Sequence, residues 1–218
     1  MPTTPPSNRR RVLAAFAALA LQAPLTAWGK GRPGLVTVLG DSITAGYGLP
    51  AEKALPAQLQ AALWRLGAAV RVRGAGVSGD TTAGGLARLD FSVQGDTDVC
   101  VVALGGNDLL QGLDPRSTRD NLRRILERLK ARRIAAVLCG LRAPPGLNAG
   151  FARDFNAMFP ALARAEGAAL YPDLLAGVAQ TAGLNQADGI HPNATGVKII
   201  ARGLAPVVAR ILRARTRR

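Results

Sequence analysis

The segment 98–104, which reads DVCVVAL, constrains the fold of this 218-residue chain more than any other feature of the sequence. Six of its seven residues are apolar. A continuous apolar run of this length is typical of a strand buried on both faces, as strands of a parallel sheet are. Because a parallel sheet is covered by helices on both faces, the segment predicts an α/β protein.

Short apolar segments alternate with amphipathic helical segments along the rest of the chain. We predict further strands at 34–39, 70–73, 134–141 and 168–171. We predict helices at 55–66, 82–89, 117–131, 151–166 and 195–214. The last helix is expected to be interrupted near Pro206, because proline removes a helical hydrogen bond. This alternation is the pattern of βαβ units, so we expect one α/β domain with a three-layer, doubly wound, flavodoxin-like parallel sheet of five strands.

Residues 1–29 have the pattern of an export signal. Three arginines at 9–11 precede the apolar run 12–21, which is too short to span a bilayer as a helix. Small residues near Ala27 suit cleavage, and the arginines resemble a twin-arginine signal. We therefore expect a periplasmic or secreted protein with a mature domain at 30–218. The alternative is an uncleaved N-terminal helix that packs on the domain.

The formal net charge is +14, from 28 basic and 14 acidic residues. Five arginines form a basic C-terminal tail: Arg210, Arg213, Arg215, Arg217 and Arg218. The plainer interpretation is a soluble domain with a solvated tail. The sharper one is peripheral contact with an anionic surface such as a membrane. We expect no nucleic-acid partner, and we expect a monomer.

The chain holds two cysteines and one histidine, too few ligands for a zinc-finger array, an iron–sulfur cluster or a His-rich metal site. We expect no metal and no cofactor. Cys100 lies near the start of its predicted strand and Cys139 near the end of the next one. Four residues of strand separate them by ~13 Å, whereas a disulfide needs Cα atoms within ~7 Å. We therefore expect two free, buried thiols.

Polar residues within glycine-rich segments follow three of the predicted strands. These segments are 40–48, 76–82 and 105–108, and a fourth, 188–192, precedes the last helix. In open α/β sheets, functional residues lie beyond the carboxyl ends of the strands. We therefore expect the four segments to meet at one edge of the sheet.

The single histidine, His191, narrows the chemistry. A Ser–His hydrolase needs an imidazole that takes the serine proton and returns it to the leaving group. Asp188, three residues earlier, can accept the other ring N–H in a turn and stabilise the imidazolium. The plainer alternative is a structural histidine.

Ser42 and Ser78 are the two candidate nucleophiles. Ser42 directly follows a predicted strand and can begin a helical turn, whose backbone N–H groups face a developing oxyanion. Its plainer role would be a helix N-cap. The GxSxG elbow of α/β-hydrolases is absent, because the segment around Ser78 lacks its spacing.

Four blocks, in order, resemble the SGNH hydrolases, also called GDSL esterases. They are Gly40-Asp41-Ser42, Ser78-Gly79-Asp80-Thr81-Thr82, Gly105-Gly106-Asn107-Asp108 and Asp188-Gly189-Ile190-His191. The resemblance runs from about 36 to 201. The segments 45–49 and 186–194 are also similar to the periplasmic thioesterase I/lysophospholipase/arylesterase subgroup. The loop 144–150 departs from that subgroup because it lacks an aromatic residue.

The resemblance implies the SGNH hydrolase fold and a role for each matching residue. Ser42 would be the nucleophile, His191 the base and Asp188 the residue that orients it. The backbone N–H groups of Ser42 and Gly79 and the side-chain amide of Asn107 would form the oxyanion hole. Substrate contacts are implied at six positions: Asp41, Gly106, Leu109, Pro145, Leu147 and Ile190.

We therefore predict a serine hydrolase that cleaves carboxylic esters or thioesters through an acyl-enzyme on Ser42. Its substrate would be a small acyl ester or thioester, as for an arylesterase, an acyl-CoA thioesterase or a lysophospholipase, with a lysophospholipid as one candidate. A carbohydrate O-acetylesterase is the alternative enzyme. An envelope-binding protein that uses its basic tail is the alternative from another class.

Overall fold

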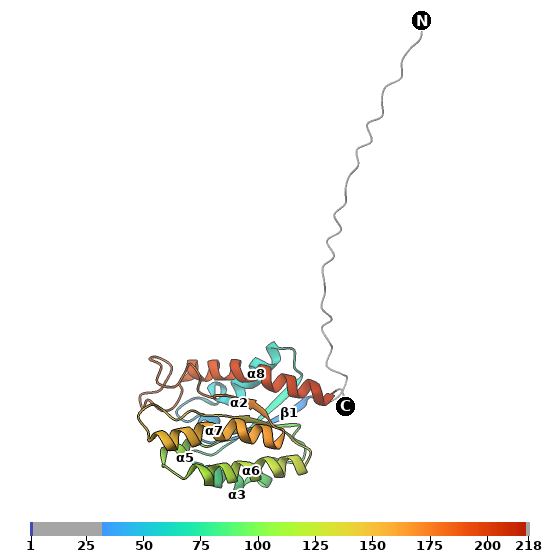
Figure 1. The fold of residues 1–218 in the computed structure, drawn as a ribbon. Helices are drawn as coiled ribbons and strands as arrows, with labels where there is room; N and C mark the ends of the chain where they lie inside the picture. The colour runs from blue at the N-terminus through green and yellow to red at the C-terminus, as the bar shows by residue number, and fades with distance from the viewer. Residues whose placement is uncertain (2–31, 217–218) are drawn as a thin grey trace.

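The computed structural model describes Met1 and residues 32–216, and they contain one five-stranded sheet (Figure 1). Its strands are β1 (Gly34–Gly40), β2 (Val70–Gly76), β3 (Val99–Ala103), β4 (Ala135–Cys139) and β5 (Ala169–Tyr171). Neighbouring strands are all parallel, in the order β2-β1-β3-β4-β5. The predicted doubly wound α/β fold is confirmed.

Helices cover both faces of the sheet, as Figure 1 shows. They are α1 (Ser42–Ala45), the 3₁₀ helix η1 (Ala51–Lys53), α2 (Leu55–Arg65), α3 (Thr82–Ala87), α4 (Leu89–Ser92), α5 (Gly106–Leu110), α6 (Pro115–Ala131), α7 (Ala149–Glu166) and α8 (Ala194–Thr216). Helices α2 and α8 pack together on one face, and α3, α6 and α7 lie on the other. All five residues of β3 are buried, which fits the continuous apolar run in its sequence.

Besides shifts of one or two residues at the ends of other elements, three predicted elements differ from the structure. Helix α8 is continuous through Pro206, so the expected interruption is wrong. Its apolar side is buried against the domain at Leu204 and Val208, and this packing holds the helix across the missing hydrogen bond. The predicted helix 82–89 ends at Ala87, and α4 follows it. Strand β2 continues to Gly76, because it pairs with β1 over its full length.

Cys100 and Cys139 are free and buried, as predicted. Cys100 pairs with Ala136 across β3 and β4, so Cys139 lies three residues further along the sheet rather than four. That offset corresponds to ~10 Å, still beyond disulfide range. Burial raises the pKa of the Cys100 thiol to about 12 and raises that of Cys139 as well. Both residues act as small buried hydrophobes.

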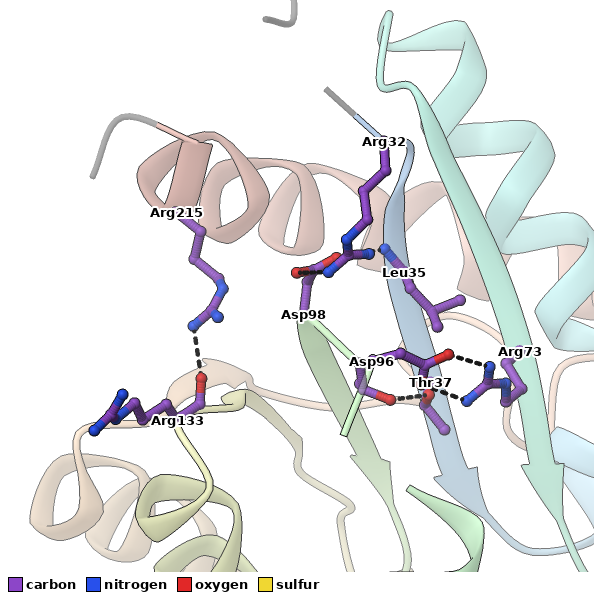
Figure 2. Close-up of polar contacts among 9 residues, drawn as sticks. Arg32, Leu35, Thr37, Arg73, Asp96, Asp98, Arg133 and Arg215 are labelled. Carbon is purple, nitrogen blue, oxygen red and sulfur yellow. Dashed lines mark hydrogen bonds and ion pairs between the residues drawn. The ribbon is translucent and has the colours of Figure 1, made fainter. Parts of the chain in front are cut away.

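Polar contacts tie the amino ends of the strands together, at the edge of the sheet shown in Figure 2. Asp98 accepts hydrogen bonds from the Leu35 backbone N–H at 2.7 Å and from Arg32 at 2.8 Å. The hydroxyls of Thr37 and Thr97 lie 2.8 Å apart in the core. Arg73, on the edge strand β2, pairs with Asp96, which precedes β3. These contacts hold the amino ends of the strands together. The polar segments singled out in the sequence lie at the opposite side, beyond the carboxyl ends of the strands.

The basic C-terminal segment is helical as far as it is described. Arg210, Arg213 and Arg215 belong to α8, and Arg215 donates to the carbonyl oxygen of Arg133 at 3.0 Å (Figure 2). Arg217, Arg218 and residues 2–29 of the expected export signal lie outside the described residues. No helix among the described residues is long and apolar enough to cross a membrane.

Candidate active site

The turn after β1 carries Ser42. Asp41 caps α1, because its Oδ1 accepts a hydrogen bond from the Ile43 N–H at 3.0 Å. A side chain at Gly40 would place its Cβ 2.1 Å from Thr44 Oγ1 and 2.9 Å from the Ala103 carbonyl oxygen, so the tight turn requires glycine. Since Asp41 provides the cap, the Ser42 hydroxyl is not used for this purpose.

His191 links Ser42 to Asp188. Its Nε2 lies 2.8 Å from Ser42 Oγ and its Nδ1 lies 2.6 Å from Asp188 Oδ2. Asp188 Oδ1 accepts from the backbone N–H groups of Ile190 at 2.9 Å and His191 at 3.0 Å. The structure thus brings together three predicted residues from two distant segments of the chain.

The hydrogen bonds to Asp188 decide its ionisation. Led by the backbone N–H and then the side chain of His191, they lower the pKa of Asp188 to about 2. Asp188 is therefore a carboxylate at neutral pH, and Nδ1 of His191 must donate to it. In the neutral imidazole, Nε2 is then the acceptor that faces the Ser42 hydroxyl.

The loop that carries His191 is held against the turn that carries Ser42 by residues to which the sequence assigned no role. The side-chain amide of Gln186 donates to the carbonyl oxygens of Tyr47 at 2.8 Å and Pro192 at 3.1 Å. The ring of Tyr47 lies on that of His191, with centroids 4.6 Å apart. Both contacts join segments far apart in the sequence. The segments 45–49 and 186–194 share a family resemblance, but no local pattern signals that they touch.

Gly79 and Asn107 follow β2 and β3. Gly79 adopts a φ of +85°, a conformation that favours glycine. The Asn107 Nδ2 donates to the Asp80 carbonyl oxygen at 2.8 Å, which ties the Asn107 side chain to the segment of Gly79. Asp108 is buried and accepts from Thr82 and Thr118, so the next residue after Asn107 is anchored inside the domain.

A cavity of about 170 Å³ opens beside Ser42, Asn107 and His191. Its walls are mostly apolar: Ile43, Ala103, Leu109, Leu110, Leu141, Leu174, Leu175 and Ile190. Besides His191, Asp41 and Arg142 are the residues of its lining with ionisable side chains. Burial raises the pKa of Asp41 to about 6. Among the described residues, no group of three or more His, Cys, Asp or Glu side chains could hold a metal ion.

Four of the six implied substrate contacts line this cavity: Asp41, Gly106, Leu109 and Ile190. Pro145 and Leu147 are exposed and do not belong to its lining. Instead, Leu141 and Arg142 at the end of β4 and Leu174 and Leu175 after β5 complete the wall. Their position after strands was a usable signal, because ligand sites gather at carboxyl ends of parallel strands.

Comparison with known proteins agrees with this geometry. Residues 38–199 match the GDSL-like Lipase/Acylhydrolase family. "Esterase TesA" from Pseudomonas aeruginosa is 40% identical over 156 residues, which cover 71% of this chain and 78% of that protein. "Thioesterase 1/protease 1/lysophospholipase L1" from Escherichia coli K12 is 37% identical over 169 residues, which cover 77% of this chain and 80% of that protein.

A solved structure also matches. The crystal structure of AlinE4, described as an SGNH-hydrolase family esterase, is 43% identical and covers 84% of this chain and 98% of its own, with a TM-score of 0.70. The family match spans most of the chain, and the two curated relatives exceed 30% identity over more than two thirds of their length. The chain therefore belongs to the GDSL-like lipase/acylhydrolase family, the SGNH hydrolases.

Proposed function

We propose that this protein is a serine hydrolase that cleaves carboxylic esters or thioesters through an acyl-enzyme on Ser42. One observation carries the proposal. The Ser42 hydroxyl, the His191 imidazole and the ionised Asp188 form an unbroken chain of contacts at 2.8 and 2.6 Å beside an apolar cavity. A nucleophile, a base and a group that orients the base are the parts that acyl transfer needs.

The reaction follows from these contacts. His191 Nε2 takes the Ser42 proton as Oγ bonds to the acyl carbon, and Asp188 stabilises the imidazolium that forms. The tetrahedral intermediate then collapses, and the imidazolium gives its proton to the departing alkoxide or thiolate. Water, deprotonated by the same imidazole, attacks the acyl-enzyme, and the carboxylic acid leaves as Ser42 regains its proton.

The negative charge on the intermediate's oxygen needs hydrogen-bond donors. The backbone N–H groups of Ser42 and Gly79 and the amide of Asn107 are the donors we assign. The Asn107 amide has two N–H bonds, and Asp80 accepts only one of them in the contact at 2.8 Å. The other N–H remains for the oxyanion, and one such donor is worth ~3–4 kcal/mol of barrier.

The cavity walls favour an acyl chain as the group that enters beside Ser42. Leucine and isoleucine side chains dominate the lining, and such walls bind hydrocarbon by excluding water. The relatives named esterase and thioesterase 1/lysophospholipase L1 support an acyl ester, thioester or lysophospholipid. An acetylated sugar would present hydroxyl groups that these walls cannot pair, so the O-acetylesterase reading has less support.

A panel of p-nitrophenyl esters and acyl thioesters of graded chain length tests the proposal. We expect hydrolysis by the wild type with kcat/KM that rises from acetyl to longer acyl groups. Each added methylene in the cavity contributes ~0.8 kcal/mol of binding until the cavity is full. Ser42→Ala should remove the activity on every substrate. Preference for acetylated sugars over all acyl esters, or no hydrolysis of either class, would contradict the proposal.

We also propose that the protein acts outside the cytoplasm, delivered by the export pattern in residues 1–29. Cell fractionation of the full chain, with and without replacement of Arg9, Arg10 and Arg11, would test this. Retention of the full-length form in the cytoplasm would contradict it.

A further inference from the structure

We infer that Arg88 is a positioning residue of the oxyanion hole, a role that rests on the function proposed above. Arg88 lies between α3 and α4, and none of its side-chain hydrogen-bond partners belongs to the cavity lining. Its guanidinium connects the carboxyl ends of β1 and β2 to the segment that carries Gly79. Through Asp80, the same connection reaches Asn107.

The Arg88 side chain makes four hydrogen bonds. Its Nε donates to Asp80 Oδ2 at 2.5 Å, and its Nη2 donates to the Gly40 carbonyl oxygen at 2.8 Å. Its Nη1 donates to the Ala75 carbonyl oxygen and to Ser92 Oγ, both at 2.9 Å. The planar guanidinium fixes the directions of all these N–H groups at once, which a lysine ammonium on a flexible stem cannot do.

Each of the three assigned oxyanion donors either lies within two residues of a partner of Arg88 or is hydrogen-bonded to one. Gly40 precedes the capped turn that presents the Ser42 N–H. Asp80 directly follows Gly79, and its carboxylate is the partner of the Arg88 Nε. The Asp80 carbonyl oxygen accepts the Asn107 amide at 2.8 Å.

The segment of Gly79 needs such an anchor. Ser78 and Gly79 are exposed, and Gly79 has no side chain that could pack. The turn is closed by the bond from the Asp80 N–H to the Val77 carbonyl oxygen at 3.1 Å. Oxyanion donors must be held within ~0.5 Å of their productive place, so the anchor at Asp80 decides where the Gly79 N–H points.

The Arg88–Asp80 pair also differs from the other ion pairs of the described residues. Its side chains are 18% and 16% exposed. In every other arginine–carboxylate pair of these residues, the more exposed side chain is at least 46% exposed. Exposed pairs contribute little because water competes for them. A pair shielded from water holds its geometry more firmly, which is what a positioning role requires.

Arg88→Lys keeps the positive charge and removes the planar guanidinium with its fixed N–H directions. We expect kcat for a p-nitrophenyl ester to fall by about 10- to 100-fold with KM changed less than about 3-fold, because displaced donors act mainly in the transition state. The rate at which an organophosphonate modifies Ser42 should fall in parallel, since its phosphoryl oxygen occupies the oxyanion hole. Unfolding in urea and circular dichroism would report the fold separately.

Arg132→Lys is the matched control. Arg132 also pairs with a carboxylate, that of Asp90, and donates to a backbone carbonyl, that of Val93, but neither partner belongs to the site. We expect wild-type kcat for this variant. Three results would overturn the inference: an equal fall of kcat in both variants, a change confined to KM in Arg88→Lys, or wild-type kcat in folded Arg88→Lys.

Gly84→Ala tests the same contact if Arg88→Lys does not fold. A Cβ at position 84 would lie 2.6 Å from Asp80 Oδ1 and must push that carboxylate away from Arg88. Alanine favours the helix, so this variant should fold and still lose kcat; wild-type kcat would overturn the inference. Ser42→Ala distinguishes failure of the proposed function from failure of the role inferred for Arg88. If Ser42→Ala keeps esterase activity, the proposed function is wrong. If it is inactive, the Arg88 variants test the positioning role alone.

Discussion

The side-chain amide of Gln186 donates a hydrogen bond at 2.8 Å to the carbonyl oxygen of Tyr47, 139 residues away along the chain. The same amide also donates to the Pro192 carbonyl oxygen, and the backbone N–H of Gln186 donates to the His191 carbonyl oxygen at 2.8 Å. One residue thus joins the loop that carries His191 to the turn that follows Ser42. We expect the 2.8 Å contact between His191 and Ser42 to depend on this junction.

Gln186→Glu should weaken catalysis although the two side chains have nearly the same size and shape. The carboxylate has no N–H and would face two carbonyl oxygens, so the histidine loop should move away from Ser42. We expect kcat to fall by about 10-fold or more. Gln58→Glu is the control, because the Gln58 amide bonds the Glu52 carbonyl oxygen far from the site. Equal kcat in the two variants would contradict the role.

Asn107→Ala should lower kcat by about 10²- to 10³-fold with a smaller change in KM, because an oxyanion donor acts mainly in the transition state. Steady-state kinetics on one p-nitrophenyl ester would measure both constants. Asn121→Ala removes another side-chain amide, bonded to Thr82 Oγ1 at 3.2 Å, and serves as the control. A defect confined to KM would instead assign Asn107 a structural role.

Asp41 should make stability depend on pH. Burial raises its pKa to about 6 from 3.8. A carboxyl whose pKa is raised in the folded protein stabilises it below the unfolded pKa, and this contribution is lost as pH rises through the folded pKa. Asp41→Asn keeps an N-cap and cannot ionise. Relative to this variant, the wild type should lose about 2–3 kcal/mol of unfolding free energy between pH 4 and pH 8.

Urea unfolding of the wild type and Asp41→Asn at several pH values would measure this difference. The comparison cancels the other titrating groups, which both proteins share. A difference that stays constant from pH 4 to pH 8 would show that Asp41 ionises as an exposed carboxyl does.

Cys100 and Cys139 should both react with a thiol reagent once the unreduced protein is unfolded. In the folded protein they should be unreactive, because both are fully buried and their thiol pKa values are raised. Two thiols per unfolded chain is the expected titration. A count of zero with a mass two hydrogens lower would mean that the two strands are aligned differently.

Local sequence predicted the parts of this fold that local interactions determine. The apolar run 98–104 contains β3. The polar segments after β1 and β3, together with the segment before α8, place Ser42, Asn107 and His191 beside one cavity. Pro206 was misjudged because a single lost hydrogen bond weighs less than the burial of the rest of α8, a tertiary effect that its own sequence does not show.

Contacts between side chains and backbone carbonyl oxygens could not be predicted from the sequence. Arg88 and Gln186 act on Gly40 and Tyr47 through main-chain oxygens, which every residue possesses, so no partner type marks them in advance. The substrate contact that the resemblance implies at Leu147 stays a prediction, because Leu147 is exposed and lies outside the cavity lining. An apolar residue in a loop has no periodicity that would tell whether it faces a cavity or solvent.

The role of Ser42 as the nucleophile can be tested by mass spectrometry of the protein after treatment with a fluorophosphonate. We expect one adduct per chain, located by peptide mapping on Ser42, formed equally in Ser78→Ala and absent in Ser42→Ala. An adduct on Ser78, or an active esterase that forms none, would contradict it.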